Sequence, residues 1–381
     1  MKYYVIAGEA SGDLHGSNLM KNLRKKDPDS QFRCWGGDLM QEQGGEIVKH
    51  YRDLAFMGFI PVLLNIRTIF KNISFCKKDL LEYKPDVLIL VDYPGFNLRI
   101  AEFAAKNNIK VFYYISPTVW AWHKSRIHKI RKYVTKLFVI LPFEKDFYKK
   151  HDMDVVFEGH PLLDAIEPEL KKKLDFNNFI AENNLEDKPM IALLAGSRKQ
   201  EVKKMLPVMA SLQEFYPGYQ FVVAGVSALG KDFYDKILKD SPIKVLFAKT
   251  YEILRLSQAG LITSGTATLE TALFDLPQAV CYKTGGLTFF IAKNLVDIKY
   301  ISLVNLIMDK EVVTELIQDK MNKISVKTEL DKLLFDENHR NTMLSEYKKL
   351  KEMLGGEGAS ERIAAKMHEI LINNKTHGLK V

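Results

Sequence analysis

Short runs of apolar residues recur through the first half of the chain, separated by longer segments with apolar residues at helical spacing. These runs span residues 3–7, 87–91, 111–115 and 137–140. The segment from Leu14 to Lys26 is one such spacer, and its periodicity predicts a helix after a loop from Gly8 to Asp13. Strands that alternate with helices are typical of a parallel β-sheet covered by helices on both faces.

The second half of the chain repeats this pattern. Its predicted strands span residues 190–195, 220–224, 243–247, 261–263 and 278–282. Between the halves, Gly159 to Pro161 precedes a polar, Lys- and Asn-rich stretch from Glu167 to Lys188, which we interpret as the linker region. A chain of 381 residues fits two domains of ordinary size. The sequence therefore predicts two Rossmann-like α/β domains, residues 1–165 and 166–345, with parallel sheets facing each other across a cleft.

The carboxyl ends of the first domain's strands carry candidate acidic residues. Ligands of parallel sheets bind at this edge, and both Glu9 and Asp92 fall there. Asp92 directly follows the apolar run 87–91, so partial burial would raise its pKa and make it a competent general base. A turn or helix-capping aspartate is the alternative interpretation. The loop after the first strand lacks the G-x-G-x-x-G pattern, which argues against a dinucleotide.

The second domain has a turn from strand to helix made of small hydroxylated residues, Ser264 to Glu270 (SGTATLE). Such a turn leaves backbone N–H groups unpaired at the positive end of the helix dipole, where a phosphate can bind. Glu270 falls in the first helical turn, and its carboxylate would suit a ribose diol. An ordinary connection between a strand and a helix is the other interpretation of this stretch.

A second turn of this kind follows the strand 190–195. Gly196 would let the backbone approach a ligand closely, and Arg198 can bind phosphate through a forked pair of donors, with Glu201 shortly after. A turn glycine beside a surface arginine is the alternative. Two turns suited to anions at one sheet edge together predict a nucleotide diphosphate site.

Composition narrows the classes of partner and compartment. The formal net charge of +8 favours anionic partners such as nucleotides, anionic lipid or nucleic acid, without choosing among them. The three cysteines have no metal or redox spacing, which indicates a reduced, cytosolic compartment. We expect no signal peptide. The sequence contains no uninterrupted run of about 18 apolar residues, so we also expect no membrane-spanning helix.

Two D-x-D matches could suggest a divalent metal, Asp27 with Asp29 and Asp152 with Asp154. Both are interpreted as turns, so no metal is expected.

Two segments suggest contact with a membrane surface. If Pro61 starts a helix, apolar residues form one stripe that continues the apolar run 55–60, and lysines follow at 77 and 78. The residues proposed for this contact are Ile60, Val62, Leu63, Ile66, Ile69 and Phe70. A buried core stripe is the alternative. The stretch from Trp120 to Lys132 carries five Lys or Arg, but no nucleic-acid-binding motif accompanies it. Anionic lipid, a phosphorylated substrate or a solvated basic helix would all account for it.

Several long motifs, in order and over almost the whole chain, resemble those of the lipid A disaccharide synthases. They are GEASGD (8–13), DYPGFN (92–97), SPTVWAW (116–122), LPFEKDFY (141–148), Gly159-His160, Gly196-Ser197-Arg198 with Glu201, SGTATLE (264–270) and YISLVNL (300–306). The resemblance implies the GT-B fold, with the last residues, about 346–381, crossing back to the first domain.

The family resemblance also implies an activity. The implied enzyme is an inverting glycosyltransferase that uses no metal or cofactor. It would join the sugar of UDP-2,3-diacylglucosamine to 2,3-diacylglucosamine 1-phosphate through a β-1,6 bond and release UDP. The enzyme would lie on the inner face of the inner membrane as a peripheral protein, at an anionic surface, and could form a homodimer.

Residue roles follow from the same resemblance. Asp92 would be the base for the acceptor hydroxyl, with Glu9 as a second carboxylate. The residues assigned to UDP are Gly196, Ser197, Arg198, Glu201, Ser264, Gly265, Thr266, Thr268, Glu270, Asn305 and Gln318.

Two other classes of protein fit part of the sequence. A UDP-sugar 2-epimerase would share the fold and the nucleotide turns, but it would have no use for an apolar surface. A non-catalytic lipid- or nucleotide-binding protein would not depend on Asp92.

Overall fold

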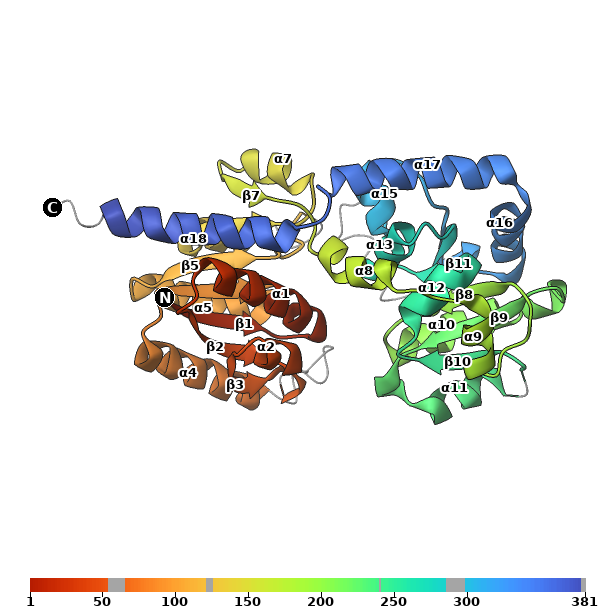
Figure 1. Cartoon of the computed structure of the whole chain (residues 1–381), viewed down its shortest axis with the longest axis horizontal. Coiled ribbons are helices and arrows are strands. Elements are labelled where there is room, and N and C mark those ends of the chain that lie inside the picture. Colours follow the sequence, from red (N-terminus) through yellow and green to blue (C-terminus); the bar gives the residue numbers. More distant parts are fainter. Residues whose placement is uncertain (54–65, 121–125, 240, 286–298, 378–381) are drawn as a thin grey trace. The chain divides into compact units, whose positions relative to one another are not determined.

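The chain forms two compact α/β units (Figure 1). The structure is a computed structural model that describes residues 1–53, 66–120, 126–239, 241–285 and 299–377. The first unit comprises Met1–Ala165 and Leu354–Val381, and the second comprises Ile166–Met353. The chain therefore leaves the first unit once and returns to it at its C-terminal end.

The described part of the first unit contains a seven-stranded parallel sheet in the order β3-β2-β1-β4-β5-β6-β7. Its strands are β1 (Lys2–Ala7), β2 (Gln31–Gly36), β3 (Glu46–His50), β4 (Val87–Val91), β5 (Lys110–Tyr114), β6 (Lys136–Val139) and β7 (Val155–Phe157). All of β4 is buried, as expected for a central strand covered on both faces.

Helices cover both faces of the first sheet. They are α1 (Ala10–Lys26), α2 (Asp38–Glu42), α4 (Ile66–Tyr83), α5 (Pro94–Lys106), α6 (Arg126–Tyr133), α7 (Glu144–Lys149) and α18 (Ala359–His377). Alternation along the strands divides the core in two. Tyr3 and Val5 of β1 pack in the cluster that contains α1 and α18, while Tyr4 and Ile6 pack in the cluster that contains α4, α5 and α6.

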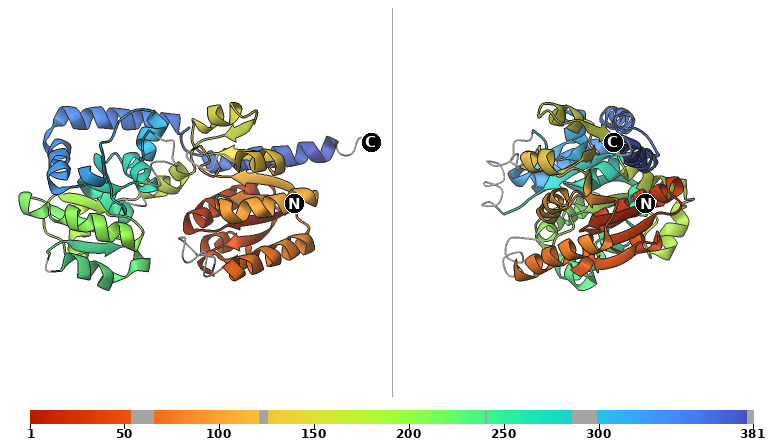
Figure 2. Two further views of the ribbon diagram at one scale, coloured as in Figure 1. Left: turned by 180° about the vertical axis from the view of Figure 1, so that it is seen from behind. Right: turned by 90° about the vertical axis from the view of Figure 1, so that its left-hand side faces the viewer.

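The C-terminal helix α18 lies along α1 in the first unit, as both views show (Figures 1 and 2). Ile363, Ala364 and Met367 of this helix are fully buried. The Asp164 carboxylate fixes the start of α18, because it accepts hydrogen bonds from the N–H groups of Gly358 (2.7 Å) and Ser360 (2.6 Å). The returning segment is therefore part of the core of the first unit.

The described part of the second unit contains a six-stranded parallel sheet in the order β10-β9-β8-β11-β12-β13. Its strands are β8 (Met190–Leu194), β9 (Gln220–Gly225), β10 (Lys244–Phe247), β11 (Ser257–Thr263), β12 (Gln278–Tyr282) and β13 (Glu315–Ile317). Its helices are α8 (Leu162–Lys171, which begins in the first unit), α9 (Phe176–Glu182), α10 (Lys199–Ala210), α11 (Lys231–Leu238), α12 (Thr250–Leu256), α13 (Thr266–Leu273), α15 (Leu303–Met308), α16 (Lys323–Phe335) and α17 (Glu337–Met353).

The structure differs from the sequence-based expectations where segments are short or polar. The pattern did not predict β2, β3, β7 or β13. Three of these lie at sheet edges, where β7 and β13 are only three residues long and β3 is partly polar. The stretch 167–188, interpreted as the linker region, contains the end of α8 and all of α9 and belongs to the second unit. Asp175 caps α9 by accepting a hydrogen bond from the N–H of Asn178 (2.9 Å).

Helix α1 begins at Ala10, four residues before the start that its apolar periodicity suggested. Most of GEASGD is therefore the first helical turn rather than a loop. Gly12 explains why the turn can form there, because a Cβ on this residue would lie only 3.1 Å from the Cβ of Ala7. The glycine lets the helix start close against the end of β1.

Candidate active site

Asp92 lies at the carboxyl end of β4 in an uncommon backbone conformation. Its φ angle is 43°, and that of Tyr93 is 48°, so two consecutive non-glycine residues adopt the left-handed region. The carbonyl oxygen of Asp92 accepts hydrogen bonds from the Tyr113 hydroxyl (2.6 Å) and from Nδ2 of Asn97 (2.7 Å). Strain of this kind occurs mostly at functional sites.

The environment of Asp92 favours its protonated form. Burial, together with the nearby charge of Glu9, raises the pKa of Asp92 to about 6, and a hydrogen bond from the Tyr93 backbone offsets part of this rise. A carboxyl group with such a pKa is ionised at neutral pH, yet it is more basic than an exposed aspartate. Asp92 therefore has the properties required of a general base.

The segment Gly8-Glu9 packs directly against the Asp92 turn. A Cβ on Gly8 would lie 2.4 Å from the Tyr93 ring, so only glycine fits beneath this ring. Glu9 is the N-cap residue of α1, and its charge acts on both Asp92 and Tyr93. The structure thus brings Glu9 and Asp92 together, as the order of the strands requires, because β1 and β4 are neighbours.

Asp13, the last residue of GEASGD, has a structural role. This buried carboxylate accepts hydrogen bonds from the backbone N–H groups of Gly37 (2.7 Å), Met40 (3.1 Å) and Leu39 (3.2 Å). These groups belong to the first turn of α2 and its N-cap, which have no acceptor within the helix. Asp13 therefore joins α1 to α2 rather than facing a ligand.

We expect Asp13→Ala to lower the free energy of unfolding by about 2–3 kcal/mol, because it leaves buried N–H groups without an acceptor. Urea denaturation of the two proteins would measure the difference. Asp29→Ala, at an exposed loop position in the same unit, is the control and should change the stability by less than about 0.5 kcal/mol. An equally stable Asp13→Ala protein would contradict this role.

In the second unit, the predicted phosphate turn joins β11 to α13. Gly265 is the N-cap residue of α13, with a φ of 122°, and a Cβ there would meet nothing within 4 Å. Thr266 is exposed, and the first N–H groups of α13 have no acceptor within the helix. The Ser264 hydroxyl donates to the carbonyl of Ile301 (2.8 Å), and the Thr268 hydroxyl donates to that of Gly265 (2.8 Å). Backbone groups of this turn, rather than these two hydroxyls, are therefore suited to an anion.

Arg198 and Glu201 are paired at the N-terminus of α10. The Glu201 carboxylate accepts hydrogen bonds from the Arg198 guanidinium (2.8 Å) and from its backbone N–H (3.3 Å). Gly196 makes this arrangement possible, because its φ is 115° and a Cβ there would lie 2.7 Å from Glu201. The Arg198 side chain stays 68% exposed. Glu201 thus orients an arginine that is accessible to an anion, and Ser197 lies beside it in the same turn.

Glu270 lines a hollow of ≈ 420 Å³ with Tyr251 and the turn after β10. The Tyr251 hydroxyl donates to its carboxylate (3.0 Å), and burial raises the pKa of Glu270. Sequence reasoning missed Tyr251, because no motif marks it. It lies on α12 and meets Glu270 of α13 only in the folded chain. This hollow has the size and the polar acceptor expected of a nucleoside site.

Asn305 is fully buried, and its amide is used within the fold. It donates to the carbonyl of Val313 (2.8 Å) and to Glu315 (3.0 Å), and it accepts from two backbone N–H groups. Glu315 also accepts from the N–H groups of Ile301 (3.0 Å) and Ser302 (2.9 Å). Asn305 therefore supports the segment to which Ser264 is bonded. Gln318 follows β13, and its amide oxygen accepts from the N–H of Thr284 (3.1 Å).

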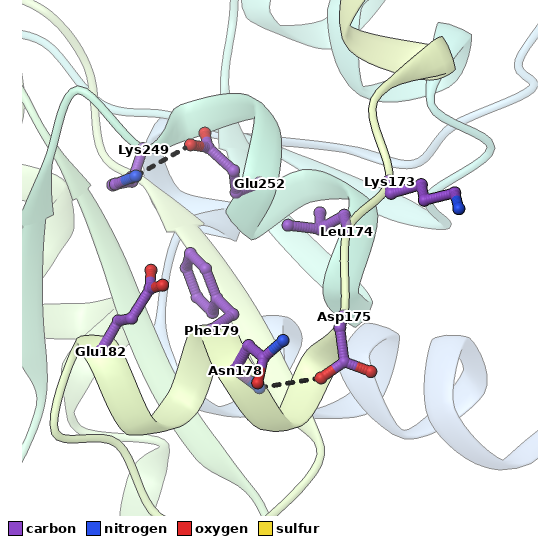
Figure 3. Close-up of a pocket in the computed structure, with 8 residues that line it drawn as sticks. All are labelled: Lys173, Leu174, Asp175, Asn178, Phe179, Glu182, Lys249 and Glu252. Carbon is purple, nitrogen blue, oxygen red and sulfur yellow. Dashed lines mark hydrogen bonds and ion pairs between the residues drawn. The ribbon is translucent and has the colours of Figure 1, made fainter.

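A larger hollow on the second unit does not coincide with the predicted site. Its volume is ≈ 650 Å³, and Figure 3 shows the residues that line it: Lys173, Leu174, Asp175, Asn178, Phe179, Glu182, Lys249 and Glu252. None of the residues assigned to UDP is among them. Lys249 pairs with Glu252 (3.2 Å) and Asp175 caps α9, so these three polar residues stabilise the fold.

Both D-x-D pairs are turns, as predicted. Asp27 accepts from the N-terminal ammonium (2.8 Å) and from Tyr3 (3.1 Å), and Asp154 pairs with Lys136. Within the ranges that the structure describes, no group of three acidic, His or Cys side chains could hold a metal ion.

The structure tests only part of the proposed membrane stripe. Ile60, Val62 and Leu63, and the side chain of Ile66, lie outside the described residues. Ile69 packs against the core of the first unit, whereas Phe70 is 57% exposed on α4. The described helices include none that is long and apolar enough to cross a membrane.

The fold places this protein in the GT-B class, which contains glycosyltransferases and UDP-GlcNAc 2-epimerases. The structure is similar to UDP-GlcNAc 2-epimerase from Neisseria meningitidis bound to UDP-GlcNAc (TM-score 0.69, 14% identity, 97% and 100% of the two chains). It is also similar to the calicheamicin glycosyltransferase CalG4 (TM-score 0.61, 13% identity, 98% of each chain). At these identities the likeness shows the fold, and the GT-B expectation is confirmed.

Sequence comparison identifies the family, which the structural similarity alone does not. The family model described as lipid-A-disaccharide synthetase matches residues 3–369. The lipid-A-disaccharide synthase of Trichlorobacter lovleyi is 37% identical over 366 residues, covering 94% of this chain and 95% of the relative. The chain belongs to the lipid-A-disaccharide synthase family, as its motifs predicted. It is a glycosyltransferase of lipid A biosynthesis, and this membership disfavours the epimerase alternative.

Proposed function

We propose that the protein transfers a 2,3-diacylglucosaminyl group from UDP to 2,3-diacylglucosamine 1-phosphate, with inversion at the anomeric carbon. The Asp92 carboxylate takes the proton of the acceptor 6-hydroxyl while that oxygen bonds to the anomeric carbon. The bond between this carbon and the diphosphate breaks, and UDP leaves with the electron pair. The β-1,6-linked disaccharide 1-phosphate is the second product.

The partly buried Asp92 at the end of β4 is the observation that carries this proposal. Its pKa of about 6 lets it be ionised at neutral pH and still accept a proton in the transition state. Inversion requires one base on the side of the attacking hydroxyl, and Asp92 fills that role alone. Glu9 tunes its basicity through charge, since the two carboxyl groups repel each other when ionised.

We assign the donor to the second unit. The exposed Arg198 guanidinium and the N–H groups of the Gly265-Thr266 turn would bind the diphosphate and stabilise its growing negative charge. Glu270, in the hollow beside Tyr251, would accept hydrogen bonds from the ribose hydroxyls. Gly196, Ser197 and Glu201 would shape the Arg198 turn, while Thr268, Asn305 and Gln318 would support the turns around the nucleotide.

We assign the acceptor and the membrane contact to the first unit, because Asp92 and the described stripe residues Ile69 and Phe70 all belong to it. The exposed Phe70 would enter the interfacial region of an anionic bilayer, and the stripe residues before it would join this contact. The enzyme would then act as a peripheral protein on the inner face of the inner membrane, as a monomer or a homodimer.

An assay with purified protein in detergent would test the proposal. The protein is incubated with UDP-2,3-diacylglucosamine and 2,3-diacylglucosamine 1-phosphate, and the products are identified by mass. We expect UDP release that depends on the acceptor, together with a disaccharide, and we expect both to persist in a chelator. UDP binding without any product, or turnover of UDP-N-acetylglucosamine alone, would overturn the proposal.

The rate should rise with pH through about 6, because only ionised Asp92 can accept the proton and its fraction grows above its pKa. Glu9→Gln removes a negative charge that raises this pKa, so the midpoint should move to lower pH. A pH profile of kcat/KM for the two proteins measures both effects. A rate that falls across this range, or a midpoint that Glu9→Gln leaves unchanged, would contradict Asp92 as the titrating base.

A further inference from the structure

We propose that the Tyr113 hydroxyl is a positioning group for catalysis, because it fixes the backbone turn from which the Asp92 carboxylate projects. This inference rests on the proposed function, in which Asp92 is the base. Tyr113 is a fully buried residue of β5, the strand next to β4, and belongs to none of the motifs that marked the site.

The turn at Asp92 needs such support. Two consecutive left-handed non-glycine residues, Asp92 and Tyr93, are strained, and strained conformations persist only when their surroundings determine them fully. Three hydrogen bonds act on the backbone groups of Asp92. Its N–H donates to the carbonyl of Tyr114 (3.2 Å), while its own carbonyl accepts from Tyr113 (2.6 Å) and Asn97 (2.7 Å).

The two hydrogen bonds to the Asp92 carbonyl fix the peptide plane after this residue. A carbonyl oxygen has two lone pairs, and here each has a buried donor. With this plane fixed, ψ of Asp92 cannot relax toward a more populated region, and the direction of its Cβ is set. The Asn97 amide also donates to the carbonyl of Val91 (3.3 Å), so this amide is shared between two carbonyl oxygens. Tyr113 makes the shorter of the two bonds.

The charged and titratable groups around Tyr113 keep it a donor. Burial raises the pKa of its phenol well above the usual value, and the charge of Asp92 adds to this rise. Tyr148 acts in the same direction, while Arg126 and a hydrogen bond with Asn97 act against it. The phenol therefore stays protonated at every pH at which the enzyme works, and it donates to the Asp92 carbonyl throughout.

The next residue of β5 provides a matched control. Tyr114 is also fully buried, but it packs in the cluster on the opposite face of the sheet. Its hydroxyl lies near Ser360, and among the described side chains it makes no hydrogen bond of ordinary geometry. Tyr114 contacts the Asp92 turn only through its backbone carbonyl, which Tyr114→Phe keeps, so this variant removes the same atom from the same strand and leaves the hydrogen bonds of the turn in place.

We expect Tyr113→Phe to lower kcat about tenfold, the loss that corresponds to one buried hydrogen bond. KM for the donor and the Kd for UDP should stay within about twofold, because the donor site lies in the other unit. Tyr114→Phe should keep kcat within about twofold, and thermal unfolding of both variants would show that they are folded. Equal kcat values for Tyr113→Phe and the wild type would overturn the inference.

A double variant separates positioning from a direct role. In an Asp92→Asn background, Tyr113→Phe should lower the residual rate no further, because the group that it positions is already absent. A further tenfold loss would overturn the inference and assign Tyr113 a role independent of Asp92. If Asp92→Asn itself kept wild-type activity, the proposed base would be wrong. An inactive Asp92→Asn protein with a fully active Tyr113→Phe protein would refute the positioning role alone.

Discussion

Asp92→Asn is expected to lower kcat by about 10³-fold while leaving the Kd for UDP within about twofold. General base catalysis contributes about 10²–10⁴-fold, and asparagine keeps the shape of the side chain without its basicity. The backbone contacts of Asp92 with Tyr113 and Asn97 involve its carbonyl, so the substitution leaves them in place. Steady-state kinetics with both lipid substrates, together with calorimetric titration of UDP, would measure the two quantities.

Asp154→Asn is the control for this substitution. Asp154 is an exposed carboxylate of the same unit that pairs with Lys136 at the surface. Its removal should leave kcat within about twofold, since exposed ion pairs contribute little to stability. If Asp92→Asn retained more than about a tenth of the wild-type kcat, another group would have to be the base. If the wild-type protein bound the lipids or UDP but formed no product from them, it would instead be a binding protein.

Arg198→Ala is expected to lower kcat/KM by about 10²–10³-fold, with weaker binding of UDP. Removing one donor from an oxyanion site typically costs this much, and a charged guanidinium forms the stronger kind of hydrogen bond with phosphate. The exposure of the Arg198 side chain and its contact with Glu201 leave it accessible and oriented. Arg198→Lys should recover only part of the loss, because lysine lacks the forked pair of donors.

The matched control is Lys203→Ala, which removes an exposed positive charge from the same helix. It should change kcat/KM by less than about threefold and leave the Kd for UDP unchanged. A similar loss in both variants would indicate a general effect of charge rather than a specific contact. Full activity in Arg198→Ala would remove the arginine from the proposed diphosphate site.

The central strands of both sheets were predictable because they are short continuous apolar runs between helical segments. Strands β1, β4 and β8 are almost entirely buried, and a strand covered on both faces has little room for polar side chains. The edge strands β3, β7 and β13 were missed because they are short and only partly covered, so their residues do not form such runs. Helix α9 was missed for a related reason, since it lies in a polar stretch and its start depends on the Asp175 cap.

Motifs identified the family, and the comparisons confirmed it, because its long matches are specific in content and order. Motifs do not separate residues that face a ligand from residues that hold the fold. Asp13 and Asp92 both lie in shared motifs, yet the Asp13 carboxylate bonds three backbone N–H groups whereas that of Asp92 is partly buried beside Glu9. In the same way, the amide of Asn305 is used by its own unit.

The sequence by itself determined the α/β class, the central strands, the family, and the acidic and basic residues at the carboxyl ends of the strands. These features depend on periodicity and on residues close in the chain. Only the tertiary structure decided that Tyr113 contacts Asp92, that Tyr251 contacts Glu270, and that the C-terminal helix α18 packs on α1. Such contacts join residues that are separated in the sequence and meet only when strands pair and helices pack. The same burial raises the pKa of Asp92, so its chemistry is a property of the fold.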